Sequence, residues 1–398
     1  MKYIETKKFS DTCISVRTIF PLERETITLI NLWLLMMCKK TQSFPTAQSL
    51  TMELSKTYGM QAGVRLSGYG PQVVVDFRFR NVRFDLMDEE KYPQDALMLM
   101  HEIMFCPILD ADALEEAKYI LKNRLARQND DPEPYTIDQA MKIIEENHTI
   151  RISLFGYPED IDAITLEQIQ AVYQSFVQQS KHTYIVGVCP ESILSYFNTF
   201  ETDPIQRDVL VPLASQQFFH KEQQRQISQS EIARIYQTDT VIGDADYPAL
   251  HVMNSILGQS PSSLLFTNIR EKNSYCYSIA STLLRSDGGL LIVTGTQRES
   301  IDAVLELLEE QITMLQHNLY SDELLHIAKK DILDGMMSVS DYPLSMIEQA
   351  FLDDLLNRSL SLDEKKAEIM RVTKPMVARA AAKLIPVSQM ILEGCSDE

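Results

Sequence analysis

The feature that most constrains the fold is a pattern of elements that occurs twice, about 217 positions apart. In the first copy, Thr46 is a suitable N-cap for a predicted helix, and two strands follow. In the second copy, Pro261-Ser262-Ser263 precedes the corresponding helix, and a strand at Leu290–Val293 lies 217 positions after the strand at Val73–Asp76. One such match could arise by chance, but four elements in the same order favour a duplication.

Each predicted pair of strands is followed by two helices. The strand at Val75–Arg80 alternates apolar and polar residues, as a strand with one solvated face does. Amphipathic helices are predicted at Pro93–Phe105 and Ile301–Leu315, and further helices at Ala113–Arg127 and Asp322–Met336. The sequence therefore predicts an α+β fold of two tandem homologous domains, each a mostly antiparallel sheet packed with helices.

The boundary between the halves is expected where this periodicity fades. A strand at Tyr184–Val188 closes the first half, and a polar, Gln-rich passage follows. We expect a first domain at residues 1–202, a linker at 203–230 and a second domain at 231–398. The two domains are expected to face each other across a cleft, which is the natural place for a ligand.

Composition and charge exclude several classes of protein. The chain has 37 Lys and Arg against 56 Asp and Glu, a net charge of −19, which disfavours a protein that binds nucleic acid phosphates. Its six cysteines form no C-x-x-C pair, as expected in a reducing compartment. The charged start lacks the apolar region of a signal peptide, and the apolar run Ile27–Cys38 is too short to span a bilayer. We expect a cytoplasmic protein in which this run is a helix buried on all sides.

Common catalytic motifs are absent from the sequence. No Gly is followed by Lys, so there is no P-loop, and neither G-x-S-x-G nor G-x-G-x-x-G occurs. Gly68-Tyr69-Gly70 is interpreted as a hairpin turn between strands. The sequence thus offers no nucleotide cradle and no serine hydrolase elbow.

The seven histidines were tested one by one against zinc peptidase motifs. His101-Glu102 alone begins an H-E-x-x-H pattern, but Phe105 stands where the second His is needed, so His101 is interpreted as a residue of a helix surface. The inverted order, H-x-x-E-H, needs Glu directly before a His, and none of the seven has one. Neither motif is therefore present.

Three segments nevertheless carry a family resemblance. They are Lys39–Thr46, the stretch from Glu115-Glu116-Ala117-Lys118 to Asp130-Asp131-Pro132, and, most specifically, Ser262–Ser278. These segments resemble the pitrilysin family of inverted zinc peptidases, and the resemblance covers nearly the whole chain. It implies the fold of the mitochondrial processing peptidases, in which repeated α+β domains enclose a chamber.

The resemblance also locates the positions that hold zinc in other members. Here they are occupied by Asn31, Leu34 and Leu35 on the apolar helix, and by Arg124 or its neighbour Asn123 in place of a ligating Glu. Leucine and arginine cannot ligate zinc, and without zinc no water is activated. The resemblance therefore implies a zinc-less member with no cofactor. A misaligned helix with zinc bound elsewhere is the alternative, which the survey of histidines disfavours.

A second signature of the family is retained. Arg270 and Tyr277 match the Arg/Tyr pair, seven residues apart, that contacts the substrate near the scissile carbonyl in active members, and Tyr275 is the competing choice for the tyrosine. Without the motif, Arg270 would be interpreted as a cation at a helix end and Tyr277 as a strand residue. With it, the resemblance implies that the pair contacts substrate.

Loss of the zinc positions together with retention of the Arg/Tyr pair is typical of short bacterial subunits that lack zinc. The leading hypothesis is a catalytically inactive subunit of a heterodimeric metallopeptidase, which binds and positions a peptide for an active, zinc-bearing partner. The alternative is a structural or peptide-binding scaffold with no role in proteolysis. An unrelated hydrolase would need a nucleophile and a base, and no such pair is recognisable. The peptide and its pathway are left open.

Overall fold

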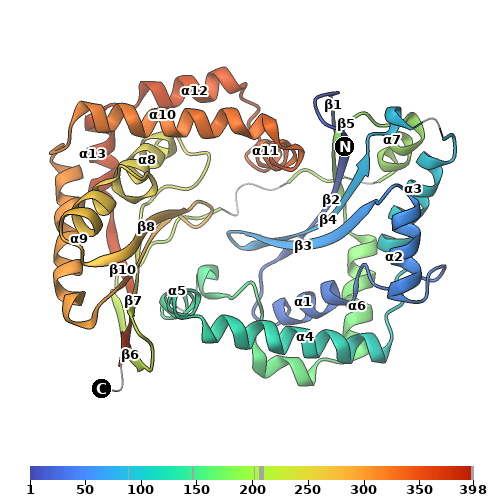
Figure 1. The fold of residues 1–398 in the computed structure, drawn as a ribbon, viewed down its shortest axis with the longest axis horizontal. Coiled ribbons are helices and arrows are strands. Elements are labelled where there is room, and N and C mark those ends of the chain that lie inside the picture. Colours follow the sequence, from blue (N-terminus) through green and yellow to red (C-terminus); the bar gives the residue numbers. More distant parts are fainter. Residues whose placement is uncertain (88, 146–147, 201, 206–209, 396–398) are drawn as a thin grey trace. The chain divides into compact units, whose positions relative to one another are not determined.

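The fold was analysed in a computed structural model that describes residues 1–87, 89–145, 148–200, 202–205 and 210–395 (Figure 1). The chain divides into two compact units, each built from three stretches of sequence. The first unit comprises residues 1–126, 153–207 and 339–357, and the second comprises residues 127–152, 208–338 and 358–398. These boundaries follow spatial contacts, whereas the expected boundaries at 202 and 231 follow the sequence repeat.

The first unit contains a five-stranded sheet. Its strands are β1 (Lys2–Glu5), β2 (Asp11–Pro21), β3 (Gln61–Tyr69), β4 (Gln72–Val82) and β5 (His182–Gly187). Their order is β1-β5-β2-β4-β3, with β1 parallel to β5 and the other neighbours antiparallel.

The second unit repeats this arrangement strand for strand. Its strands are β6 (Phe219–Arg225), β7 (Ser230–Gln237), β8 (Cys276–Leu284), β9 (Gly289–Thr296) and β10 (Ile385–Gly394). Their order is β6-β10-β7-β9-β8, with β6 parallel to β10 and the other neighbours antiparallel. The predicted α+β class and the predicted duplication are confirmed, and β6 lies inside the range that was expected to be a linker.

Helices cover both faces of each sheet. In the first unit they are α1 (Ile27–Met36), α2 (Ala47–Lys56), α3 (Tyr92–Phe105), most of α4 (Ala111–Asp130), α6 (Leu166–Gln178), α7 (Glu191–Asn198) and α11 (Pro343–Leu355). In the second unit they are α5 (Pro132–Lys142), α8 (Tyr247–Asn254), α9 (Ile301–Gln316), α10 (Asp322–Ser338), α12 (Leu362–Arg371) and α13 (Lys374–Ala382). The predicted N-cap Thr46 accepts a hydrogen bond from the backbone of Ser49 at 3.0 Å and begins α2.

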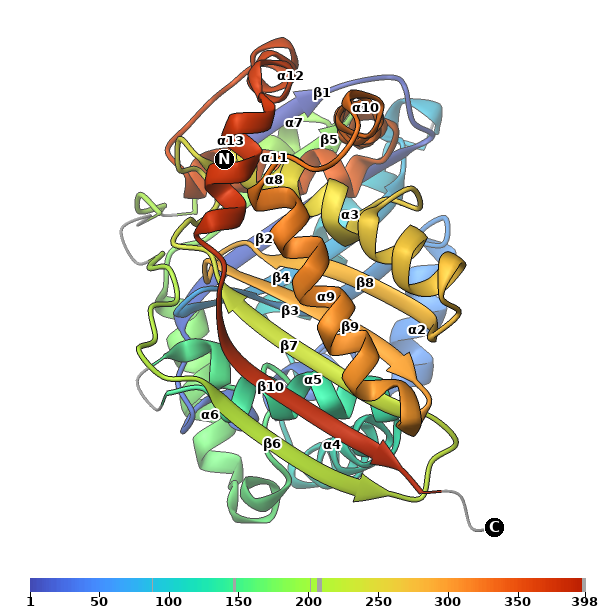
Figure 2. The same cartoon turned by 90° about the vertical axis from the view of Figure 1, so that its left-hand side faces the viewer.

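Each half of the sequence supplies one helix to the sheet of the other half. The helix α11 packs on β5 and β2 of the first unit, where Ile347, Phe351 and Leu355 are buried. The helix α5 packs on β7 and β10 of the second unit, and the buried Ser388 hydroxyl donates to the carbonyl of Ala140 at 2.7 Å. In Figure 2, α9 crosses the near face of the second sheet and α5 lies behind it.

A buried ionic network fixes α11 to its sheet. The guanidinium of Arg17 on β2 is 1% exposed, and its Nη2 lies 3.3 Å from Asp76 and 2.9 Å from Glu348 of α11. Its Nε donates to the Ser15 hydroxyl at 3.1 Å, and the guanidinium lies 4.4 Å from the centroid of the Phe351 ring. Burial alone would lower the pKa of Arg17, but the two carboxylates outweigh it and raise the pKa. Asp76 belongs to the sheet itself, and α11 supplies Glu348, the second carboxylate beside the guanidinium.

Candidate functional site

Of the three positions on α1 where the resemblance expects zinc ligands, two are buried in the interior of the first unit. Asn31 is buried, and its Nδ2 donates to the carbonyls of Ile27 and Leu154, each at 2.9 Å. Leu34 is 9% exposed, and Leu35 is half-buried. The expectation of a helix buried on all sides is therefore corrected at Leu29 and Leu35, which are partly accessible. These side chains pack the protein and offer a metal neither imidazole nor carboxylate.

The opposite side of α1 explains why this helix is so apolar. Trp33 is fully buried, and its ring centroid lies 6.3, 6.4 and 5.3 Å from those of Phe20, Phe77 and Phe176. Aromatic pairs in such tilted and edge-on arrangements contribute beyond their buried area. Replacing side chains on either face of α1 therefore disturbs the core of the first unit.

Across the whole described chain, no helix is both long and apolar enough to cross a membrane.

The position where the resemblance expects a ligating Glu lies on the solvent-facing side of α4. Arg124 and Asn123 are both exposed, and the Asn123 side chain donates to the carbonyl of its own helix at Tyr119. A guanidinium has no lone pair available for a metal. Within the residues that the structure describes, no group of three or more His, Cys, Asp or Glu side chains is placed to hold a metal ion.

The retained Arg/Tyr pair is brought together on the second unit. Arg270 belongs to a π-helical segment at Phe266–Lys272, a wider turn that is often found at functional sites. Its guanidinium carbon lies 4.5 Å from the centroid of the Phe266 ring and 5.6 Å from that of Tyr277. Arg270 is half-buried and makes no ion pair with any described residue. Its donors are therefore free for an outside acceptor.

The two candidate tyrosines have different environments. Tyr277 is the extra residue of a β-bulge in β8 and is 76% exposed, with its ring beside Arg270. Tyr275 is partly buried and packs against the hydrophobic core of the second unit. The structure therefore places Tyr277 in solvent next to the arginine and directs Tyr275 inward. A guanidinium and a phenol so arranged can donate hydrogen bonds to a peptide carbonyl or to the oxyanion that develops from it.

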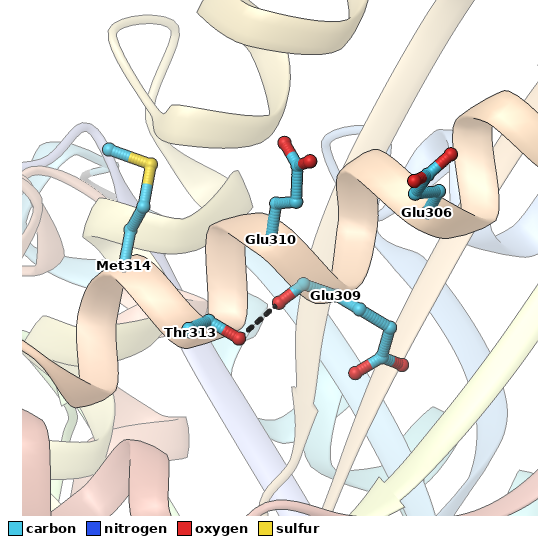
Figure 3. Close-up of a pocket in the computed structure, with 5 residues that line it drawn as sticks. All are labelled: Glu306, Glu309, Glu310, Thr313 and Met314. Carbon is cyan, nitrogen blue, oxygen red and sulfur yellow. Dashed lines mark hydrogen bonds between the residues drawn. The ribbon is translucent and has the colours of Figure 1, made fainter.

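A shallow pocket lies on α9 (Figure 3). It is lined by Glu306, Glu309, Glu310, Thr313 and Met314, and the Thr313 hydroxyl donates to the carbonyl of Glu309 at 2.9 Å. The Glu309 carboxylate is already paired with Arg234 at 2.7 Å and accepts from the Tyr236 hydroxyl at 3.0 Å. The pocket carries no assigned role.

Glu231 on β7 has a carboxyl pKa raised well above its ordinary value. Burial is the main cause, and Glu133 and Asp131 at the start of α5 add repulsion, so that the pKa rises from 4.5 to about 7. Its Oε2 is buried and has no hydrogen-bond partner within the described residues. Because the pKa is raised on folding, the protonated carboxyl is more favourable in the folded state than in the unfolded state.

This displacement predicts a pH-dependent stability. The contribution of Glu231 to the stability of the folded protein is fully present below about pH 4.5 and is lost as the pH rises through about 7. The free energy of unfolding of Glu231→Gln should therefore equal that of the parent protein near pH 4.5 and exceed it by about 1–2 kcal/mol at pH 8. This figure is smaller than the full pKa shift would give, because the carboxyl is partly solvated. Urea unfolding at both pH values measures the difference. Glu299→Gln, at an exposed carboxyl of the same unit, is the control, and an equal gain at both pH values would contradict the assignment.

The comparisons with known proteins agree with this geometry. Residues 163–332 match the family model described as "Peptidase M16 inactive domain". Over 410 aligned residues the chain is 25% identical to "Probable inactive metalloprotease YmfF" of Bacillus subtilis (strain 168), covering 98% of this chain and 95% of that protein. The chain is an inactive-type homologue in the M16 peptidase family. The family expected from the three sequence segments is thereby confirmed.

The chain is also similar to a second curated protein and to a solved structure. The chain is 21% identical over 305 residues to "Uncharacterized zinc protease YmxG" of the same Bacillus strain, covering 74% of this chain and 73% of that protein. The crystal structure of a conserved protein from Enterococcus faecalis V583 superposes with a TM-score of 0.91 at 23% identity, over 100% of this chain and 96% of that one. The fold of this M16 homologue is therefore shared along its whole length.

Proposed function

We propose that this chain is the non-catalytic, zinc-less subunit of a heterodimeric M16 peptidase, and that it lends Arg270 and Tyr277 to a peptide site shared with an active, zinc-bearing subunit. One observation carries the proposal: the positions where the resemblance expects zinc ligands hold a buried Asn31 and Leu34, a half-buried Leu35 and an exposed Arg124, none of them a metal ligand, while Arg270 and the exposed Tyr277 lie side by side. A chain retained only as a scaffold has no need of this arrangement.

The relatives supply a plausible type of partner. One bacterial strain has both a relative named as a probable inactive metalloprotease and a relative named as a zinc protease. By analogy, the partner of this chain is an M16 protein with an intact inverted zinc motif, encoded in the same genome. The substrate is a peptide, and its sequence is left open.

The direct experiment is co-purification with such a partner, followed by a peptide-cleavage assay and metal analysis. The complex is expected to cleave peptides and to contain about one zinc, held by the partner. This chain alone is expected to contain no stoichiometric zinc and to cleave nothing. One tightly bound zinc per isolated chain would overturn the proposal.

Substitution of the pair tests its contribution. In the complex, Arg270→Ala or Tyr277→Phe is expected to lower kcat/KM by about ten- to a thousandfold, because each removes a donor to the developing oxyanion. Lys330→Ala, an exposed lysine of α10, and Tyr119→Phe, an exposed tyrosine of α4, are matched controls that should leave the rate unchanged. Unchanged rates for the Arg270 and Tyr277 variants, with the heterodimer intact, would leave only a scaffold role.

A further inference from the structure

The bulge that exposes Tyr277 is a local departure from a regular strand pair. Cys276 pairs with Thr296, but Ser278 pairs with Gly295, so β8 contains one residue more than β9 at this point. A bulge of this kind leaves the extra residue outside the ladder and redirects its side chain. Tyr277 owes its exposure beside Arg270 to this shift.

Two buried threonines of β9 hold the backbone on both sides of the bulge. The Thr296 hydroxyl donates to the carbonyl of Tyr275 at 2.5 Å, and the Thr294 hydroxyl donates to the carbonyl of Ser278 at 2.8 Å. Both threonines are almost completely buried. The hydroxyls therefore satisfy two backbone carbonyls next to Tyr277 from inside the protein, where water does not compete.

The duplicated unit provides an internal comparison. In the first unit, β3 and β4 pair in continuous register from Gln61 with Arg80 to Tyr69 with Gln72. At the 217-position offset, Thr294 and Thr296 correspond to Phe77 and Phe79, which have no hydroxyl and are buried in the core. The bulge and the two hydroxyls thus occur together in one copy, whereas the other copy has a continuous register and two phenylalanines.

The segment that carries Arg270 is fixed separately. Asn268, in the same π-helical segment, donates at 2.5 Å to Oε1 of Gln311, a buried residue of α9 that is itself bound to the carbonyl of Leu307 at 3.0 Å. The backbone N–H of Ser274 donates to the carbonyl of Arg270 at 3.1 Å. Arg270 therefore has its own anchor, and the position of Tyr277 relative to it depends on the bulge.

The geometry points to Thr294 and Thr296 as positioning residues for the Arg270 and Tyr277 pair. This inference rests on the proposed function and deepens it. The threonines contact neither substrate nor reacting atoms. They hold the register shift that keeps the phenol beside the guanidinium, because a one-residue slip in pairing turns a strand side chain to the opposite face.

A structural experiment on the isolated chain tests the positioning itself. Thr294→Val, Thr296→Val and their combination keep the shape of the side chain and remove the hydroxyl, and Thr296→Ser restores the donor. Crystal structures of the valine variants are expected to show a regular β8–β9 register, with the Tyr277 ring moved out of the roughly 6 Å range of cation–π contact with Arg270. A preserved bulge in the double variant would overturn the inference. Thr282→Val, at an exposed position of β8, is the control.

A kinetic experiment on the heterodimer tests whether the threonines act through Tyr277. Thr296→Val is expected to lower kcat about tenfold, Thr296→Ser to restore it, and Thr296→Val to have no further effect in a Tyr277→Phe background. Equal effects in both backgrounds would mean that Thr296 contributes only to stability, which would overturn the positioning role. If Tyr277→Phe alone were silent, the proposed function would fail, while the crystallographic result would still report on the bulge.

Discussion

Residues 1–202, produced without the rest of the chain, are expected not to fold under conditions in which the full chain is stable. This fragment lacks α11, whose Ile347, Phe351 and Leu355 are buried against the first sheet. Burying three large apolar side chains contributes about 5–9 kcal/mol, which is comparable to the whole stability of a typical domain. The fragment also lacks Glu348, and so Arg17 is left buried with incomplete neutralisation.

The reciprocal fragment, residues 210–398, is expected to fail for the corresponding reason. It lacks α5, which covers Ile235, Met390 and Leu392 of the second sheet. Circular dichroism and urea unfolding of each fragment should show no cooperative transition, and co-expression should restore a folded complex. Residues 1–202 joined by a flexible linker to residues 339–357 form the matched control, which is expected to fold alone. A cooperative transition of the unmodified fragment 1–202, at the midpoint of the full chain, would contradict the exchange of helices.

The sequence repeat predicted two similar sheets correctly because the pattern of helix, strand and strand is a local signal, whereas the strand order was not predicted and includes the distant pairs β1 with β5 and β6 with β10. The copies of the helix, strand and strand pattern lie 217 positions apart, and each strand pair is joined by a short hairpin. The exchange of α5 and α11 could not be predicted in the same way. An amphipathic helix has an apolar face but no local signal that says which of two similar sheets it will cover. The buried Arg17 and its partner Glu348 lie 331 positions apart, so no local pattern connects them.

In the candidate site, too, the features carried by a local sequence motif were predicted, and the features that depend on a neighbouring strand were not. The family motif named Arg270 and Tyr277, and the structure brings both side chains together. The bulge was not predicted, because it depends on hydroxyls of Thr294 and Thr296 in the neighbouring strand. The one local signal in the sequence was the Asn273-Ser274 dipeptide, whose residue types are common in turns. In the structure Ser274 has a φ of 55°.

Restoring the three side chains of an inverted zinc motif on α1 is expected to destabilise the protein and not to restore a metal site. In the combination Asn31→His, Leu34→Glu and Leu35→His, the loss of Leu34 burial costs about 2–3 kcal/mol, and an unpaired carboxylate in its place adds several more. Replacing Asn31 removes two hydrogen bonds, of which the one to Leu154 joins α1 to a distant segment. The expected loss in the free energy of unfolding is thus at least about 4 kcal/mol.

Zinc is not expected to compensate for this loss. Arg124 stands where the resemblance places the remaining protein ligand, and a guanidinium repels a cation and cannot ligate it. A bound metal stabilises a protein only in proportion to its affinity for the folded state. Excess zinc should therefore leave the unfolding midpoint of the triple variant unchanged.

The fluorescence of Trp33, the only tryptophan, reports this unfolding directly because the residue is completely buried beside the substituted positions. Urea titrations with and without zinc, together with metal analysis after dialysis, complete the measurement. Arg124→Glu is the control: it places a carboxylate at an exposed position of α4 and should change stability by less than about 0.5 kcal/mol. A triple variant that unfolds at the parent midpoint and retains one zinc would show that α1 can still form a metal site. That result would contradict the assignment of these positions to the packed core.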